Sequence, residues 1–353
     1  MPASSDAFAT AWAYRRYSYA AVAGSTALGF CFPAQAGLLL GLPLAVGMVV
    51  LGIAHGACDQ LVVPAGPHPA EAVVSGWRYW QRFLLSYLSL AGLVGVLWWG
   101  WPAATVGIFF LLTIWHWGSA DAPAAAQVSA SWWLVHSLLR GLLLFAVPAW
   151  WWPAETADIV NSLLTFTGAS IVPQPQFELF TTGLGLVVLA GHGVLWARYA
   201  SRRQWALLQT ELVEILVLLA LLLALPPRLS VGVYFVFWHS LQHVLRLTGW
   251  LGYAASAGGL AGAKVALLPQ LVFFLRRAAP LLLVSCAALL VLGRLLLDRL
   301  TTEHAWFSLA LVVASIVTLP HALLVTVVMD AARWRGPEAH SRQMAAAGPT
   351  AKP

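Results

Sequence analysis

Seven of the ten histidines in this chain lie within or at the ends of strongly apolar segments. Ionisable side chains are costly inside a membrane and usually serve a function there. His239 and His243 are four residues apart, so on a helix both rings lie on one face and reach a single point. His55 and His116 each end a separate apolar segment. A set made only of imidazoles suits Fe, Cu or Zn and does not suit Mg or Ca, so these four residues predict a transition-metal site.

The composition predicts a membrane setting for this site. Of the 353 residues, 60% are hydrophobic and 9% are charged, and the mean hydropathy is +0.79. A soluble domain carries roughly 25% charged residues because its surface faces water. The apolar residues also occur in long runs, which is the transmembrane pattern. We therefore predict an all-α, polytopic transmembrane helical bundle. Its basic residues sit in short clusters between apolar runs, which argues against nucleic-acid binding.

Apolar runs of about 20 residues predict ten membrane spans, with nine as the alternative. They lie at about 19–34, 36–58, 83–99, 101–117, 132–152, 177–197, 205–225, 229–247, 278–297 and 306–329. With both termini in the cytoplasm, fifteen of the 19 Lys and Arg residues lie on the inside, as the positive-inside rule requires. We expect a multi-pass protein of the cell (inner or plasma) membrane. Residues 1–18 would be a polar N-terminal segment, 19–330 a single transmembrane catalytic domain, and 331–353 a polar, disordered tail.

This topology places the four histidines in one layer of the membrane. The second, fourth, eighth and tenth predicted spans all run from outside to inside. His55, His116 and His243 lie near the inner ends of their spans, and His239 lies one turn earlier. His321 lies deeper in the tenth span. For this residue, a role in supporting the metal site and a hydrogen bond between helices are equal alternatives. For His136 and His192 we expect hydrogen bonds between helices.

Carboxylates near these histidines are candidates for orienting the rings. Asp59 follows His55 by four residues and Asp121 follows His116 by five. Each carboxylate would accept the second imidazole N–H and so fix the tautomer, although both residues also suit helix caps or headgroup contacts. Glu214, with Glu211 beside it, lies in the same half of the seventh span. Either glutamate is also a candidate partner for Arg140, which would be costly in a span without one.

Aromatic residues surround the histidine motifs. Most of the 19 tryptophans are expected in a belt at the membrane interface. Five aromatic residues lie close to the predicted ligands and are candidate walls of an apolar substrate site. They are Trp115, Trp117, Tyr234, Phe235 and Trp238.

Together these segments resemble the Brp/Blh family of bacterial and archaeal β-carotene 15,15′-dioxygenases. The resemblance rests mainly on the block from Gly52 to Asp59 and on the block from Tyr234 to His243. The His116 block, Arg140–Pro148, Glu211–Glu214 with Pro226–Pro227, and Leu319–His321 also match, in family order, over most of residues 50–330. Gln60 departs from the family, which often has a second histidine there.

The resemblance implies a membrane-embedded, non-haem iron enzyme. Such an enzyme would use O₂ to cut β-carotene at its central double bond and form two molecules of retinal. The family's Fe²⁺ ligands correspond to His55, His116, His239 and His243. A retinal-binding rhodopsin is a candidate acceptor of the product.

Three other functions fit parts of the pattern. A transporter that moves metal ions or protons would use intramembrane His and Glu, but it predicts inverted repeats and helices broken at mid-bilayer. A haem protein with two axial imidazoles would show a Soret band. A family member that has lost catalysis and regulates retinal supply is less consistent with intact histidines.

Overall fold

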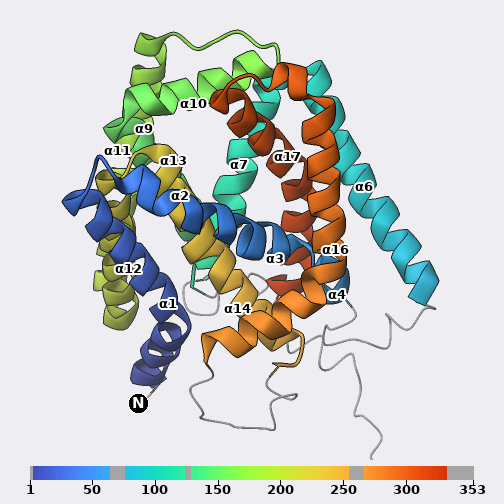
Figure 1. Cartoon of the computed structure of the whole chain (residues 1–353). Helices are drawn as coiled ribbons and strands as arrows, with labels where there is room; N and C mark the ends of the chain where they lie inside the picture. Colours follow the sequence, from blue (N-terminus) through green and yellow to red (C-terminus); the bar gives the residue numbers. More distant parts are fainter. Residues whose placement is uncertain (1–2, 64–75, 124–128, 254–265, 332–353) are drawn as a thin grey trace, which may run out of the picture.

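The computed structural model describes residues 3–63, 76–123, 129–253 and 266–331, and these residues form helices without strands (Figure 1). The first half contains α1 (Ala3–Cys31), α2 (Ala36–Gly47), η1 (Met48–Ile53), α3 (Ala54–Gly56), α4 (Asp59–Val62), α6 (Gly76–Gly100), α7 (Pro102–Asp121), α9 (Ala130–Trp151) and α10 (Pro153–Phe166). The second half contains α11 (Gln174–Ser201), α12 (Trp205–Ala224), α13 (Pro227–Val233), η2 (Tyr234–Ser240), α14 (Leu241–Trp250), α16 (Leu267–Leu295), η3 (Leu297–Arg299), α17 (Glu303–Leu324) and η4 (Val325–Met329).

Eight helices in the described part of the chain are long and apolar enough to cross a membrane. The predicted first and eighth spans are also helical, as α1 and as the continuous run α13–η2–α14, but they are less apolar. The count of ten spans and the orientation of the termini stay predictions. Exposed leucines such as Leu179, Leu186, Leu283 and Leu290 cover the outer faces of α11 and α16. A soluble monomer rarely exposes such large apolar patches, so these faces suit lipid.

Helices extend beyond the predicted spans at two places. Helix α1 runs unbroken from Ala3 to Cys31, so it continues from the first predicted span into the N-terminal segment. Helix α10 occupies the stretch that the hydropathy pattern left as a connection, and it lies across one end of the bundle (Figure 1). The predicted tail lies almost wholly outside the described residues, which end at residue 331.

Proline and a hydroxyl cap set where several helices begin. Pro102, Pro153 and Pro227 occupy the first turns of α7, α10 and α13, where the missing N–H would have no partner anyway. At the start of α17, the hydroxyl of Thr302 accepts a hydrogen bond of 3.2 Å from the backbone N–H of Ala305. Each of these four helices therefore begins at a residue whose backbone or side chain suits a helix start.

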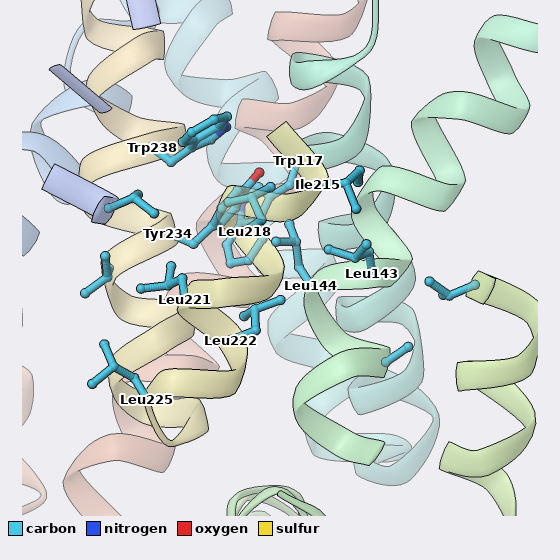
Figure 2. Packing of buried hydrophobic residues seen from close by; sticks show 14 of the residues in the cluster. Trp117, Leu143, Leu144, Ile215, Leu218, Leu221, Leu222, Leu225, Tyr234 and Trp238 are labelled. Atoms are coloured by element: carbon cyan, nitrogen blue, oxygen red, sulfur yellow. The ribbon is translucent and has the colours of Figure 1, made fainter. Parts of the chain in front are cut away.

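The main apolar core joins helices that are far apart in the sequence. Figure 2 shows Leu143 and Leu144 of α9 and Leu218 of α12 packed around Trp117 and Tyr234. Trp117 belongs to α7 and Tyr234 to η2, so this core fixes the two helices that carry His116 and His239.

Glycines allow α7 to approach α9 closely. A Cβ added at Gly118 would collide with the carbonyl oxygen of Ser137, and one added at Gly141 would collide with that of Ile114. Small residues at such crossings let helix backbones pack in a membrane, where hydrophobic exclusion from water does not drive association. The position of His116 therefore depends on this crossing.

We expect Gly118→Ala to lower the yield and melting temperature of the folded protein, because backbone atoms cannot move aside as a flexible side chain can. Gly107→Ala, also in α7, is the matched control, since an added Cβ there meets nothing within 4 Å. Fluorescence-detected gel filtration in detergent measures both variants. Equal folded yields would show that the close crossing is not required.

Candidate metal centre

The structure brings the four predicted ligands together in the interior of the bundle. The ring of His55 lies 6.0 Å from that of His239 and 5.3 Å from that of His243, measured between centroids. The rings of His116 and His239 are 5.0 Å apart. All four side chains are buried, with at most 6% exposed. Three separate regions of the chain thus deliver imidazoles to one enclosed place.

His321 joins the same cluster from α17. Its ring centroid lies 4.9 Å from that of His55, 5.1 Å from that of His116 and 5.3 Å from that of His243. This places His321 as near to the predicted ligands as they are to one another.

π-Helical turns occur beside three of these histidines. Segment η1 ends directly before the short helix that carries His55, η2 contains His239, and η4 begins four residues after His321. A π-turn inserts an extra residue into an α-helix and is frequent at functional sites. Gly47 and Gly52 let η1 approach η2, because a Cβ at either position would collide with Val236 or Phe235.

Several ring nitrogens in this cluster are buried without a hydrogen-bond partner. Among the described residues these are both nitrogens of His116 and His239 and the Nε2 atoms of His243 and His321. A buried polar atom without a hydrogen-bond partner costs about 1–3 kcal/mol. Several such atoms in one cluster therefore call for a bound partner. A transition metal is the partner that accepts several imidazole lone pairs at once.

The rings must turn before they share one metal ion. No three His, Cys, Asp or Glu side chains in the described part of the chain already converge in a metal-binding arrangement. The donor types, their number and their orphaned nitrogens fit a metal such as iron, whereas the present ring orientations pack edge against face.

The outer partners of the rings determine which nitrogen faces the cluster. The Nδ1 atom of His55 lies 3.1 Å from the Leu51 carbonyl oxygen, which can only accept, so Nδ1 carries the proton and Nε2 keeps its lone pair. His243 has the opposite tautomer. Arg246 donates a hydrogen bond to its Nδ1 at 3.1 Å, so Nδ1 keeps its lone pair and Nε2 carries the proton. Arg246 also contacts Asp330 at 3.2 Å. For Nε2 of His243 to bind a metal, Arg246 must release the ring.

Asp59 orients a different histidine from the one expected. Both of its carboxylate oxygens lie 2.9 Å from Nδ1 of His321, and Tyr87 donates its hydroxyl proton to Asp59 at 3.2 Å. Helix α3 ends at Gly56 and α4 begins at Asp59, so the two residues do not share a continuous helical face. Tyr87, on α6, was not predicted, and its spacing in the sequence gives no signal for it.

Asp121 and Glu214 also bind partners other than the expected rings. Asp121 accepts hydrogen bonds from the Tyr234 hydroxyl at 3.1 Å and from the Trp238 indole at 2.9 Å. Glu214 pairs with Arg15 and Arg140 and accepts from the Tyr19 hydroxyl at 3.1 Å. Their contacts stabilise the packing of the helices around the cluster and do not set a histidine tautomer.

The pairing predicted for Arg140 is confirmed. Its guanidinium lies 3.3 Å from Glu211 and 2.6 Å from Glu214, and Arg140 is 2% exposed. His136 adds a contact of 3.0 Å to Glu211, and its Nδ1 lies 2.6 Å from the Tyr199 hydroxyl. His192 bonds the Val188 carbonyl in its own helix at 2.9 Å, and its Nε2 lies 4.0 Å from Glu211 on α12. We call Arg15, Asp121, Arg140, Glu211 and Glu214 the buried charge network.

Arg15 brings the N-terminal helix into this network, which sequence analysis did not foresee. We expect Arg15→Gln to lower the melting temperature in detergent, because three buried carboxylates then share one guanidinium. Adding Glu214→Gln should restore much of that loss, since it removes one negative charge as well. A double variant no more stable than the single one would show that Arg15 acts through packing and not through charge.

Only some of the predicted aromatic walls face the histidines. Trp117 lies 5.7 Å and Phe235 6.1 Å from the ring of His239, and Tyr234 lies 6.5 Å from it. Trp115 instead packs against Trp133 at 5.5 Å. The indole of Trp238 donates to Asp121 while its ring lies 5.2 Å from Tyr19. The structure thus separates three residues beside the cluster from two that pack elsewhere.

A buried imidazole cluster among span-length apolar helices defines a helical membrane protein with a candidate transition-metal centre. The chain belongs to the β-carotene 15,15′-dioxygenase family, whose model matches residues 46–329. It is therefore an enzyme of the oxidoreductase class. The Blh protein of Halobacterium salinarum, described as a probable β-carotene 15,15′-dioxygenase, is 29% identical over 308 residues, covering 80% of this chain and 83% of that protein. No solved structure matches the chain.

Proposed function

We propose that this protein is a membrane-embedded, iron-dependent dioxygenase that cuts β-carotene at the 15,15′ double bond and forms two molecules of all-trans-retinal. The observation that carries the proposal is the buried imidazole cluster with its unpartnered ring nitrogens, found in a member of this enzyme family.

His55, His116, His239 and His243 would hold the iron. Four neutral imidazoles add no negative charge to Fe²⁺ and leave coordination positions open. When bound, ferrous iron would supply the redox chemistry that lets O₂ react with a closed-shell alkene. The protein's own contribution is to present the ring nitrogens in a site closed to water by Trp117, Phe235 and the surrounding helices.

The substrate would approach through the apolar side of the site. β-Carotene is a long hydrocarbon that partitions into lipid, so an enzyme with lipid-facing helices meets it where it dissolves. Trp117, Tyr234 and Phe235 lie beside His239 and would hold the flat polyene by dispersion. These walls would place the central double bond at the histidine cluster.

The reaction needs no proton from the protein. One carbon–carbon double bond breaks, and each of its carbons forms a double bond to one atom of the same O₂ molecule. Hence the buried charge network need not deliver protons, and its contacts with Tyr234 and Trp238 are better explained as positioning of the helix that carries His239. Retinal would leave into the bilayer of the cell membrane, where a retinal-binding rhodopsin is a candidate acceptor.

The test is the identity and stoichiometry of the products. The protein, purified in detergent, is incubated with β-carotene under ¹⁸O₂ and its products are separated by chromatography. Two molecules of retinal for each β-carotene consumed, each with one ¹⁸O atom before exchange with water, would support central cleavage by a dioxygenase. Longer and shorter apocarotenals in equal amounts would contradict it and indicate another cleavage position.

A further inference from the structure

We infer that His321 is a fifth protein ligand of the metal, with Asp59 and Tyr87 as the residues that position it. The inference rests on the proposed function in one respect, that the histidine cluster binds a metal. It concerns which nitrogens bind and how many positions remain for O₂.

The position of His321 completes the cluster. Without it, the ring of His116 lies close to only one of the other three predicted ligands, His239 at 5.0 Å. His321 lies 5.1 Å from His116 on one side and 4.9 Å from His55 on the other. With His321 included, each of the five imidazole rings has at least two of the others as ring neighbours, whereas His116 has one without it.

The tautomer of His321 suits metal binding. Asp59 can only accept a hydrogen bond while ionised, so Nδ1 of His321, at 2.9 Å, carries the proton and donates it. The lone pair is then on Nε2, as it is for His55 beside the Leu51 carbonyl. A carboxylate on the outer nitrogen of a histidine is the usual arrangement behind metal ligands, where it raises the basicity of the inner nitrogen.

The Nε2 atom of His321 is buried and takes part in no hydrogen bond among the described residues. A role limited to linking α17 with α4 through Asp59 would need only Nδ1. It would not explain why Nε2 is buried without a hydrogen-bond partner, because an apolar side chain at that position would avoid the cost.

Asp59 itself is held in place from a third helix. The Tyr87 hydroxyl of α6 donates to the carboxylate at 3.2 Å, so α4, α6 and α17 meet at this pair. A fifth imidazole would leave one fewer open position on the metal than four would. O₂ would then have a more restricted direction of approach to the substrate.

Cobalt(II) provides a test that does not depend on activity. Its visible absorption strengthens as the number of ligands falls, and its affinity is measured by competition with a chelator. We expect His321→Gln in the full-length protein to bind Co²⁺ more than about 100-fold more weakly and with a stronger spectrum, and Asp59→Asn to weaken binding by about 10–100-fold. His192→Gln is the control, a buried histidine bonded to its own helix, and should match the wild type in both readouts.

A second variant separates ligand loss from unfolding. In His321→Gly, added imidazole should restore the wild-type cobalt spectrum, which it cannot do if the side chain only packs. Unchanged affinity and spectrum in His321→Gln, with metal still bound by the wild type, would overturn the fifth ligand and leave the proposed function intact. Absence of metal binding by the wild-type protein would overturn both.

Discussion

His116→Ala is expected to abolish retinal formation and to remove most of the bound iron. Both ring nitrogens of His116 lack a hydrogen-bond partner in the described structure, so the substitution removes no hydrogen bond between side chains that holds the fold together. Replacing a residue that merely orients a metal ligand costs 10–100-fold in metal affinity or activity, and loss of a ligand should exceed that range.

The control for this result is His192→Gln, because His192 is equally buried but lies on α11 with its Nδ1 bonded to Val188. It should keep its iron and its activity. Iron content by mass spectrometry and retinal by chromatography, on samples with matched gel-filtration profiles, measure both variants. Wild-type iron in His116→Ala would remove that residue from the ligand set.

Arg140→Met should prevent accumulation of the folded protein, although Arg140 pairs with carboxylates of the buried charge network and not with the five clustered histidines. Met has a similar length and fills the space, but it leaves Glu211 and Glu214 as buried carboxylates that have lost their shared partner. Breaking a buried ion pair on one side costs about 3–5 kcal/mol, which approaches the whole stability of many proteins.

Arg228→Gln is the comparison for this prediction. Arg228 also pairs with carboxylates, at 3.1 Å from Glu303 and 3.7 Å from Asp158, but those carboxylates are 82% and 56% exposed. Exposed pairs contribute about 0–1 kcal/mol, so this variant should fold nearly as well as the wild type. Thermal unfolding in detergent distinguishes the two variants. A similar small effect for both would mean that water reaches the buried charge network.

Spacing and matching depth in the predicted spans indicated that His55, His116, His239 and His243 meet, whereas the sequence left two roles open for His321. Spacing and depth did not predict which carboxylate faces which ring. Asp121 lies five residues after His116 on one helix, which turns it about 140° away from the ring and toward Tyr234 and Trp238. Asp59 reaches His321, 262 residues away, and such pairs depend on tertiary packing.

The polar residues of the site also lower the hydropathy of the helical run that carries His239 and His243. The run α13–η2–α14 contains His239, Ser240, Gln242, His243 and Arg246, and it falls outside the eight helices apolar enough to be recognised as spans. Helix α1 is less apolar because it is rich in Gly, Ala and Ser, yet it supplies Arg15 to the buried charge network. Residues outside the region matched by the family model thus contribute to the structure around the site.

Cleavage is expected to depend on iron bound by the histidine cluster. The most direct measurement removes the metal from the purified protein with a chelator, then adds back Fe²⁺ or Zn²⁺ and follows retinal by chromatography. We predict that activity falls with the iron content, returns with Fe²⁺ and does not return with Zn²⁺, which binds imidazoles but has no redox chemistry. Full activity in the metal-free protein, or equal recovery with Zn²⁺, would contradict this dependence.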